Sequence, residues 1–433
     1  MIVGGGVSGV AVAIHLLRRG GRTLHIVLVE KGSQVGRGIA FGVSSPVFRL
    51  NVPASKMSLD PQRPDDFMAW AGADASAFLP RATFARYVAV RFDEARRGSL
   101  ATLQIVRGEA VALDGRSVRL SDGVDLPADT VVLATGIEPR IGPSPLPADA
   151  RIIDAWDEGA LASLPLAGRL MVLGSGLSAL DVVALLDAQG FEGSVTVLSR
   201  RGLLPRAHLS PLRSSVPLPR DQVDAAPATL AGLLRWCRSI VREHQARGLP
   251  WQLGIEALRP HVMHLYRSLP PAHRARFVRS VRPFWDVLRH RAPPDALDLV
   301  EALRQQGRLE ILAGRIASCQ LLPDAIELGL ALANAPPRGI RVDRIVRCIG
   351  PALDRSEADA PLDRALVASG LAAADPAGLG IVTDELGRVV DPSGEASERL
   401  LAIGAVLRAS SWESTAVPDI SVHALALAKR IVP

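Results

Sequence analysis

The chain has 433 residues, of which 48% are hydrophobic and 22% charged, a composition that excludes disordered and fibrous proteins and indicates two or three globular domains. Its net charge is +6, carried almost entirely by arginine, but no basic run is interleaved with aromatic residues, so no nucleic-acid partner is expected. The cysteines, Cys237, Cys319 and Cys348, are far apart, which argues against a redox-active pair and any metal site. No leader-like segment and no apolar stretch of membrane length is evident, so a cytoplasmic protein without membrane contact is expected.

The first predicted element is a β-α-β unit with a glycine fingerprint, G-x-G-x-x-G, at residues 4–9. It lies between the short apolar Ile2-Val3 and a helical stretch from Val10 to Leu17, where glycines allow a tight turn and the helix N-terminus can bind a pyrophosphate. About 20 residues later a predicted strand ends in a carboxylate that can accept hydrogen bonds from ribose hydroxyls. An unmodified adenosine ribose, as in FAD or NAD, is therefore expected. The predicted contacts are Gly4, Gly6, Ser8, Gly9, Glu30 and Lys31.

The rest of the N-terminal third contains a loop at 36–42, two helices, a polar β region and a buried strand that ends in a tight turn at Gly136. The turns Asp114-Gly115 and Asp122-Gly123 predict hairpins in the β region. Proline-rich residues 139–147 are expected to be the linker that leaves the first domain. The predicted helices are 63–71 and 81–97, the β region is 101–126, and the strand begins at 129.

A second fingerprint, at residues 174–179, follows the apolar run 170–173 and precedes a predicted strand at 195–198. Here the position equivalent to Glu30 is occupied by a base, Arg200. Arginine side chains and a serine hydroxyl can bind a ribose 2′-phosphate through charge-assisted hydrogen bonds, whereas a carboxylate would repel it. The second nucleotide is therefore predicted to be NADPH. Its predicted contacts are Gly174, Gly176, Ser178, Ala179, Ser199, Arg200 and Arg201.

About a hundred residues without strand alternation follow, and their helical patterns predict a helical insertion at about 203–307, because structureless loops of that length are rare. Several strands complete the chain. The predicted helices are 229–247, 255–267, 272–289 and 294–306, and the predicted strands are 309–312, 316–322, 325–332, one ending at 344–351, and one ending at 400–404.

Together these residues resemble two-dinucleotide-domain flavoproteins, and within them bacterial FAD/NAD(P)-binding proteins related to N-hydroxylating and other class B flavin monooxygenases. The resemblance covers essentially the whole chain. It is carried by both fingerprints with Glu30 and the arginines, and by the segments 36–42, 50–57, 134–136, 285–291 and 404–418. It implies an α/β fold with two Rossmann-like domains: a discontinuous FAD domain, 1–160 and 336–433, and an inserted NADPH domain, 161–335, that carries the helical insertion. It further implies FAD contacts at Gly38, Leu50, Asn51, Met57, Thr135, Gly136, Gly404 and Thr415.

The resemblance also implies a helix entered near Thr415, with Pro418 in its first turn, whose N-terminus points at the flavin. Many relatives have an aspartate after the glycine equivalent to Gly404, whereas this chain has Ala405. Water or Glu413 is expected to take over the ribityl contact of that aspartate.

Three candidate catalytic residues follow from the resemblance. Asn51, in an Asn-x-Pro-x-x-x-Met pattern with Met57, would lie beside flavin and nicotinamide, where an uncharged amide can hydrogen-bond reactive oxygen without protonating it; the alternative is an Asx turn. Arg289 and His290 would belong to a charged lid over NADPH phosphate or an anionic substrate; the alternative places Trp285 in a core with solvated arginines.

Three functions remain compatible with the sequence. The first is an NADPH-dependent FAD monooxygenase that transfers one oxygen atom from molecular oxygen to a small nucleophilic substrate, for example an amine. The second is an NADPH-dependent reductase or dehydrogenase without oxygen transfer. The third is a non-catalytic flavin-binding sensor.

Overall fold

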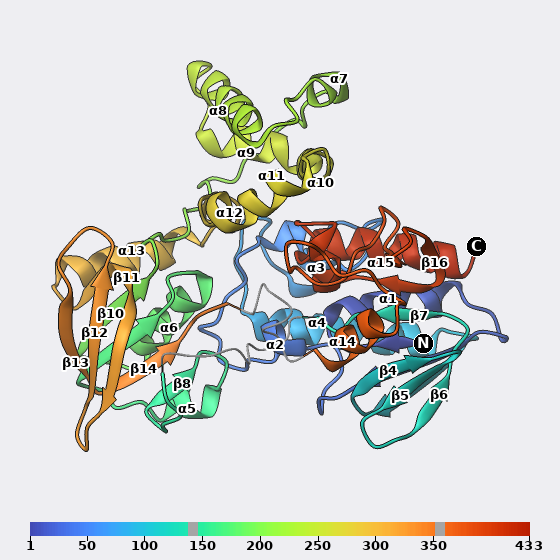
Figure 1. Ribbon diagram of the computed structural model, residues 1–433, viewed down its shortest axis with the longest axis horizontal. Helices are drawn as coiled ribbons and strands as arrows, with labels where there is room; N and C mark the ends of the chain where they lie inside the picture. Colours follow the sequence, from blue (N-terminus) through green and yellow to red (C-terminus); the bar gives the residue numbers. More distant parts are fainter. Residues whose placement is uncertain (137–145, 351–359) are drawn as a thin grey trace.

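The computed structural model describes residues 1–136, 146–350 and 360–433, so part of the predicted linker at 139–147 and Pro351 lie outside the described residues. Figure 1 shows two α/β domains side by side and a stack of helices that projects above their junction. Each domain is built around one sheet, and the helical stack belongs to the segment that connects two strands of the second sheet. No helix in the described ranges is long and apolar enough to cross a membrane.

The first sheet has six strands in the order β15-β16-β7-β1-β2-β3, with β1 paired in parallel to both β2 and β7. Helix α1, Val7–Arg19, is buried from Val7 to Leu17 except at Ser8, because it packs against the sheet and between α4, Arg81–Arg97, and α15, Val417–Ile431. The N-terminal and C-terminal parts of the chain therefore share one hydrophobic core. The strands are β1 Ile2–Val3, β2 His25–Glu30, β3 Thr102–Arg107, β7 Val131–Leu133, β15 Arg388–Val390 and β16 Ala396–Ala402.

The polar β region predicted at 101–126 divides between two sheets. Its first strand, β3, joins the main sheet beside β2, and the remainder forms a separate antiparallel sheet of three strands. Gly115 and Gly123, with φ of +53° and +89°, make the two predicted turns. The three strands are β4 Ala110–Asp114, β5 Ser117–Leu120 and β6 Asp125–Pro127.

The second sheet has seven strands in the order β13-β12-β11-β10-β9-β14-β8, parallel from β8 to β11 and antiparallel beyond. It begins at residue 152 and ends at 347, so the predicted second-domain limits of 161 and 335 were too narrow. The predicted strands 309–312 and 316–322 are one continuous strand, β11. The strands are β8 Ile152–Asp154, β9 Arg169–Leu173, β10 Ser194–Ser199, β11 Leu309–Leu321, β12 Ile326–Leu332, β13 Arg338–Val342 and β14 Arg344–Arg347.

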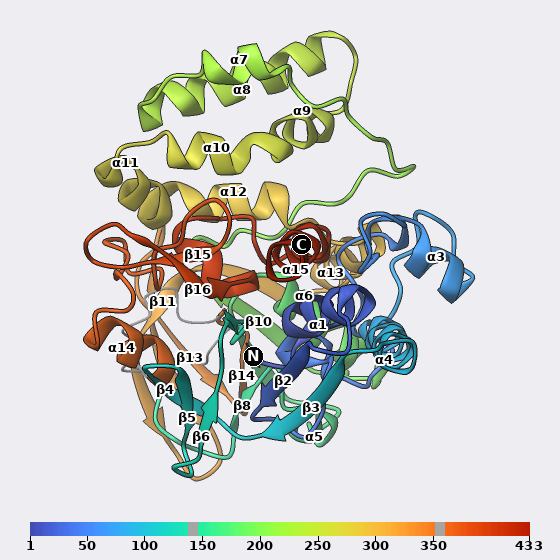
Figure 2. The same cartoon turned by 90° about the vertical axis from the view of Figure 1, so that its right-hand side faces the viewer.

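The helical insertion is shorter than predicted. Helix α13, Pro294–Gln305, packs against α6, Leu177–Ala188, and β11, so it is the crossover helix between the parallel strands β10 and β11. The true insertion lies between β10 and α13 and forms layers, with α7 and α8 uppermost and α12 nearest the first domain (Figure 2). Its helices are α7 Arg220–Asp224, α8 Leu230–Ala246, α9 Trp251–Leu258, α10 Val262–Arg267, α11 Pro271–Arg276 and α12 Arg282–Arg289.

Two predicted helices of the insertion are interrupted. A 3₁₀ turn, η2 at Arg259–His261, separates α9 from α10, and a π-helical turn, η3 at Phe277–Val281, separates α11 from α12. The first break contains Pro260, and the second lies just before Pro283. Proline has no N–H, which disfavours a continuous helix. Outside the insertion, the remaining short elements are α2 Gly38–Phe41, η1 Ala54–Lys56, α3 Asp66–Ala71, α5 Glu158–Ala162, α14 Pro361–Ala368 and η5 Gly404–Ala409.

Candidate functional site

The first fingerprint makes the tight strand-to-helix turn that its glycines require. Gly4 has φ of +105°, and a Cβ there would lie 2.2 Å from the carbonyl oxygen of Ala134 on the neighbouring segment. A Cβ at Gly9 would lie 1.9 Å from the carbonyl oxygen of Gly4, so the helix packs directly on the turn. The segment predicted as loop at 36–42 contains the short helix α2, which brings Gly38 against the backbone of Gly6.

The second fingerprint has the same construction. Gly174 has φ of +113°, and a Cβ there would lie 2.4 Å from the carbonyl oxygen of Cys348. This close approach matches that of Gly4 to Ala134. The amide of Gly174 donates to Leu198, the equivalent of the Gly4 bond to Val29, at 2.7 and 2.8 Å. No atom lies within 4 Å of a Cβ added at Gly176, so the backbone is open to a ligand at the start of α6.

Glu30 is the last residue of β2, but the matching residue of β10 is Ser199, and Arg200 follows one position later, so the predicted equivalence of Glu30 and Arg200 is off by one residue. Glu30 also has protein partners. Its carboxylate accepts hydrogen bonds from the backbone amides of Gly5 and Gly32, both at 2.6 Å. Each carboxylate oxygen retains a further acceptor position for a ribose hydroxyl. Glu30 also lines a cavity at the carboxyl ends of the strands together with Gly4, Lys31 and Thr135. Binding in such a crevice is the rule for open α/β sheets.

The C-terminal segment closes this site from the other side. Gly404 has φ of +72°, and a Cβ there would lie 2.5 Å from the hydroxyl oxygen of Ser8. The following helix, α15, begins at Val417 with Pro418 in its first turn, as predicted from the position of Thr415. Two buried hydroxyls in these segments, those of Thr135 and Ser414, have no hydrogen-bond partner among the described residues. Unsatisfied buried hydroxyls and a closely approached backbone fit a nucleotide with many polar groups.

Two other predicted contacts serve the core. Leu50 and Met57 are 4% and 2% exposed and pack within the main cluster of the first domain. Their side chains therefore help to fix the 50–57 segment.

A cluster of three guanidinium groups lies beside the second fingerprint, where the second nucleotide is predicted. Arg200 and Arg201 follow β10, and Arg282 from α12 lies close enough for their positive charges to act on it. Burial, with these like charges, lowers the pKa of Arg282, although Asp286 opposes the shift. The Arg282 Nε atom is buried without a hydrogen-bond partner. Ser199 accepts a hydrogen bond from the Gly202 amide at 3.0 Å, so its hydroxyl partly serves the turn.

Arg282 was missed in the sequence because it lies about 80 residues beyond the fingerprint arginines. Only the packing of α12 brings it to them.

Asn51 lies in a cavity of about 240 Å³ between the two domains. Arg49 and Arg81 line it from the first domain, and Leu177 and Asp181 line it from the start of α6. The amide side chain makes no hydrogen bond with the part of the chain that the structure describes, and the residue two positions on is a proline, which has no N–H to donate. The Asx-turn alternative is therefore not formed, and the amide is free to contact a ligand.

The backbone of Asn51 is held by a histidine of the second domain. The Nε2–H of His208 donates to the Asn51 carbonyl at 2.8 Å. Burial lowers the pKa of His208 to about 4, although this hydrogen bond and the Glu256 carboxylate oppose the shift. The imidazole is therefore neutral near pH 7 and fixes the Asn51 backbone as a hydrogen-bond donor.

Comparison with known proteins agrees with this geometry. Residues 1–138 match the family described as FAD-NAD(P)-binding, and no curated protein matches. Three similar solved structures are the ornithine N-hydroxylase of Kutzneria sp. 744, the ornithine hydroxylase of Pseudomonas aeruginosa and the cadaverine monooxygenase of Erwinia amylovora. Their TM-scores are 0.63, 0.64 and 0.67, and their identities 14%, 17% and 14%. They cover 99%, 100% and 99% of this chain and 97%, 98% and 94% of their own. The chain has the two-dinucleotide-domain flavoprotein fold.

Two of the residues between 285 and 291, for which a lid was predicted, have a buried protein partner. Glu413, 7% exposed, accepts a hydrogen bond from Trp285 Nε1 at 3.1 Å and forms an ion pair with Arg289 Nε at 2.9 Å. The helix α12 is therefore bound to the loop that precedes α15. His290 ends α12, and its burial lowers its pKa to about 4. Each carboxylate oxygen of Glu413 thus has one partner within the protein, and the contact proposed for it beside Ala405 stays a prediction.

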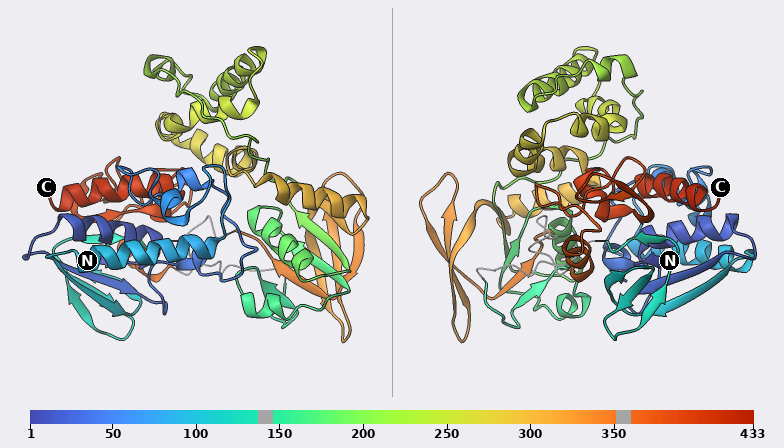
Figure 3. Two further views of the ribbon diagram at one scale, coloured as in Figure 1. Left: turned by 180° about the vertical axis from the view of Figure 1, so that it is seen from behind. Right: turned by 45° about the vertical axis from the view of Figure 1, so that its right-hand side comes forward.

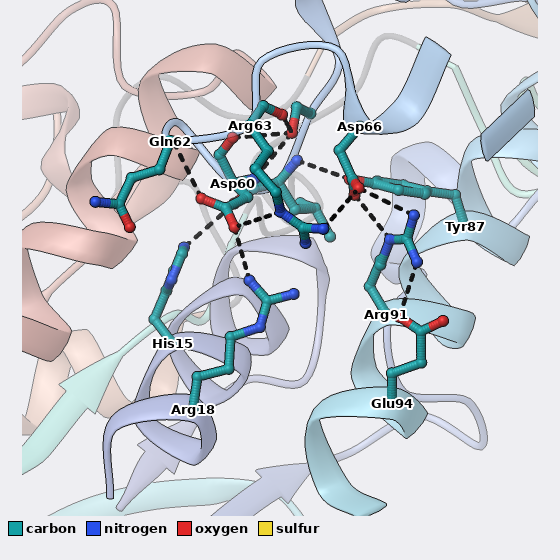
Figure 4. Close-up of polar contacts among 11 residues, drawn as sticks. His15, Arg18, Asp60, Gln62, Arg63, Asp66, Tyr87, Arg91 and Glu94 are labelled. Atoms are coloured by element: carbon teal, nitrogen blue, oxygen red, sulfur yellow. Dashed lines mark hydrogen bonds and ion pairs between the residues drawn. The ribbon is translucent and has the colours of Figure 1, made fainter. Parts of the chain in front are cut away.

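A charged network beyond the Asn51 segment also escaped the sequence reasoning (Figure 4). Asp60 forms ion pairs with Arg18 of α1 and with Arg63, at 2.9 and 3.2 Å, and Asp66 accepts hydrogen bonds from Tyr87 and Arg91 of α4, at 2.7 Å each. Burial alone would raise the pKa of Asp60, but the Gln62 amide and the two arginines hold it below its usual value. The network fixes residues 57–66 against both helices, and so supports Met57 and Asn51. Charged residues so far apart show no pattern in sequence.

No group of three or more histidine, cysteine or acidic residues within the described ranges could hold a metal ion.

Proposed function

We propose that this protein is an NADPH-dependent FAD monooxygenase that oxidises a small nucleophilic substrate, for example an amine. The observation that carries the proposal is the difference in charge beside the two turns, which are otherwise built alike: Glu30 ends β2, whereas Arg200 and Arg201 directly follow the end of β10. In this proposal FAD lies in the discontinuous first domain and NADPH in the second. The limits of the second domain are those of its sheet, residues 152–347. The two ornithine hydroxylases and the cadaverine monooxygenase of the same fold support this class of function.

When bound, FAD and NADPH would supply the redox chemistry: a hydride from NADPH would provide two electrons, one atom of molecular oxygen would go to the substrate, and the other would leave as water. The protein supplies binding and orientation. Glu30 would accept hydrogen bonds from the adenosine ribose of FAD, and Thr135 and Ser414 would donate their unpaired hydroxyls to its other polar groups.

The second nucleotide would be held by the arginine cluster. Arg200, Arg201 and Arg282 would bind the 2′-phosphate, since their gathered positive charges favour an anion. Asn51 would face the nicotinamide end of this nucleotide, because its cavity adjoins the first residue of α6.

Asn51 is proposed as the residue nearest the chemistry. Its amide can donate or accept a hydrogen bond but cannot supply a proton near pH 7, which favours oxygen transfer over release of hydrogen peroxide. Arg289 is proposed as a positioning residue that holds α12 on the 404–416 loop through Glu413, and His290, at the end of the same helix, as a second positioning residue.

Rapid mixing of the NADPH-reduced protein with oxygen tests the proposal. With NADP⁺ bound, we expect a delayed, multiphase return of the oxidised flavin absorbance. A single fast return with one hydrogen peroxide per flavin would contradict oxygen transfer, and anaerobic turnover with a quinone or flavin acceptor would then favour the reductase. If NADPH never bleaches the bound flavin, the sensor is favoured. If the purified protein contains no flavin, both enzymatic functions are excluded.

A further inference from the structure

The helical insertion forms a partly open cavity of about 600 Å³ that no cofactor contact described above uses. It lies among α8, α9, α10, η3 and α12, the layered helices of Figures 2 and 3, and one residue of the first domain, Trp412, completes its wall. Cavities of roughly 300–1,000 Å³ are typical of small-molecule sites. Its size therefore suits a ligand rather than a packing defect.

The wall of this cavity is rich in aromatic side chains. Only 4% of the chain is aromatic, yet three of its six tryptophans and one of its two tyrosines line this one space. Phe284 also lines it and is 51% exposed, which is unusual for a phenylalanine without a ligand. The tryptophans and the tyrosine are Trp251, Trp285, Trp412 and Tyr266. Such a surface binds an apolar chain or ring.

The charged groups of the lining have one sign. Arg238 and Arg242, one turn apart on α8, are both exposed at the cavity, and no aspartate or glutamate lines it. Neither arginine forms an ion pair with the described residues, although most arginines of the first domain do. Unpaired guanidinium groups beside an apolar cavity favour an anionic group on the ligand and disfavour an ammonium group.

The cavity also adjoins both proposed cofactor sites. Phe284 lies beneath the guanidinium of Arg201, 5.6 Å from the ring centre, and Trp412 beneath that of Arg282, at 5.8 Å. Trp412 directly precedes Glu413 on the loop that leads to α15. A ligand in the cavity would therefore touch side chains that contact the arginine cluster.

We propose that this cavity binds the apolar body of an organic anion, and that this anion is the substrate class of the reaction proposed above. That the bound anion is a substrate rests on the proposed function. That the cavity binds an anion with an apolar body rests on the aromatic wall and the two arginines. The oxidised nucleophile would belong to a molecule that carries an apolar chain or ring and a carboxylate or similar anion, and not to a free, polar diamine.

Calorimetric titration of the purified flavin-containing protein tests the site, with decanoate and decylamine as probes that share a chain and differ in head charge. We expect decanoate to bind at least about tenfold more tightly, since a charge-assisted contact contributes that much. Replacing both arginines, Arg238→Gln with Arg242→Gln, should remove this preference while decanoate still binds weakly. Val241→Trp, which fills the cavity, should abolish binding of both probes.

The matched control is Arg235→Gln, an exposed arginine of α8 that does not line the cavity, and it should bind decanoate as the unaltered protein does. Flavin content and circular dichroism would verify that each variant is folded. Equal binding of the two probes, no binding of either, or an unchanged Val241→Trp variant would overturn the proposal. So would a dimer that binds neither probe and that Val241→Trp dissociates, because a second copy would then cover the cavity.

The titration needs neither NADPH nor oxygen, so it is independent of turnover. If decanoate binds as expected but NADPH fails to reduce the flavin, the monooxygenase proposal is wrong and the anion site stands.

Discussion

The guanidinium of Arg81 on α4 lies 2.5 Å from the carboxylate of Asp181 on α6, and this ion pair joins the two dinucleotide domains beside Asn51. Burial raises the pKa of Asp181 to about 6 from 3.8, although Arg81 and Arg49 oppose the shift. The carboxylate is thus charged at pH 7, although its burial disfavours the charge. The guanidinium of Arg81 offsets this cost, so the contact between the domains depends on that arginine.

Arg81→Gln should destabilise the protein by about 3 kcal/mol at pH 8, because it leaves a largely buried carboxylate without its cation. The loss should shrink at pH 5, where Asp181 is protonated. Because the carboxyl pKa rises from 3.8 to about 6 on folding, protonation stabilises the folded state fully below pH 3.8, and this contribution is lost as the pH rises through about 6. Urea unfolding followed by circular dichroism measures both. The double variant with Asp181→Asn should recover most of the loss, and a double variant as unstable as Arg81→Gln would show that the pair is not the cause.

Gly404→Ala should weaken retention of flavin. The new methyl group would meet the Ser8 hydroxyl at 2.5 Å, and an alanine at φ of +72° costs about 1–2 kcal/mol by itself. Gly370→Ala is the matched control, because Gly370 has φ of +73° with no atom within 4 Å of the added Cβ. Flavin released on dialysis measures the effect. Equal flavin loss in the two variants would show that the approach to Ser8 is unimportant.

Replacing Arg200 and Arg201 by glutamine should raise the KM for NADPH by about a hundredfold and leave that for NADH nearly unchanged, since about 1.4 kcal/mol is lost for each charge-assisted contact with the 2′-phosphate. Steady-state NAD(P)H oxidation gives both values. Arg213→Gln, an exposed arginine in the same connection, should change neither. Similar losses for both nucleotides would show that the arginines do not read the phosphate.

Asn51→Ala should retain flavin and NADPH oxidation but release more hydrogen peroxide for each NADPH consumed, because the amide that favours oxygen transfer is gone. The peroxide-to-NADPH ratio measures this in air. The control is Ser55→Ala, at a half-buried residue of the same segment, which should leave the ratio unchanged. An unaltered ratio in Asn51→Ala would remove Asn51 from the chemistry.

The protein should lose stability as the pH falls from 6.5 to about 4, partly through His208. Its pKa of about 4 in the folded state is below the ordinary 6.5, so the unfolded chain binds more protons in that window. This proton binding lowers the free energy of unfolding by about 1.4 kcal/mol for each pH unit. His208→Gln should flatten this dependence, as measured by urea unfolding at several pH values. His25→Gln, at an exposed histidine, is the control; an unchanged slope in His208→Gln would contradict the assignment.

Much of the fold was readable because it depends on local patterns. Glycine spacing and apolar runs predicted both β-α-β units, and helix α4 has the predicted limits, 81–97. The errors lie where partners distant in sequence decide. Residues 294–306 have the same helical pattern as the insertion, but their packing on α6 and β11 makes them part of the second domain.

The sequence by itself determined the two turns and the charges at the ends of their second strands, because these depend on residues at short, regular spacing. Only the tertiary structure brought Arg282 to Arg200, joined Trp285 and Arg289 to Glu413, placed His208 on Asn51 and formed the aromatic cavity. The physical reason is that these contacts join segments about 80 to 160 residues apart, and side-chain packing, which has no period along the chain, selects them.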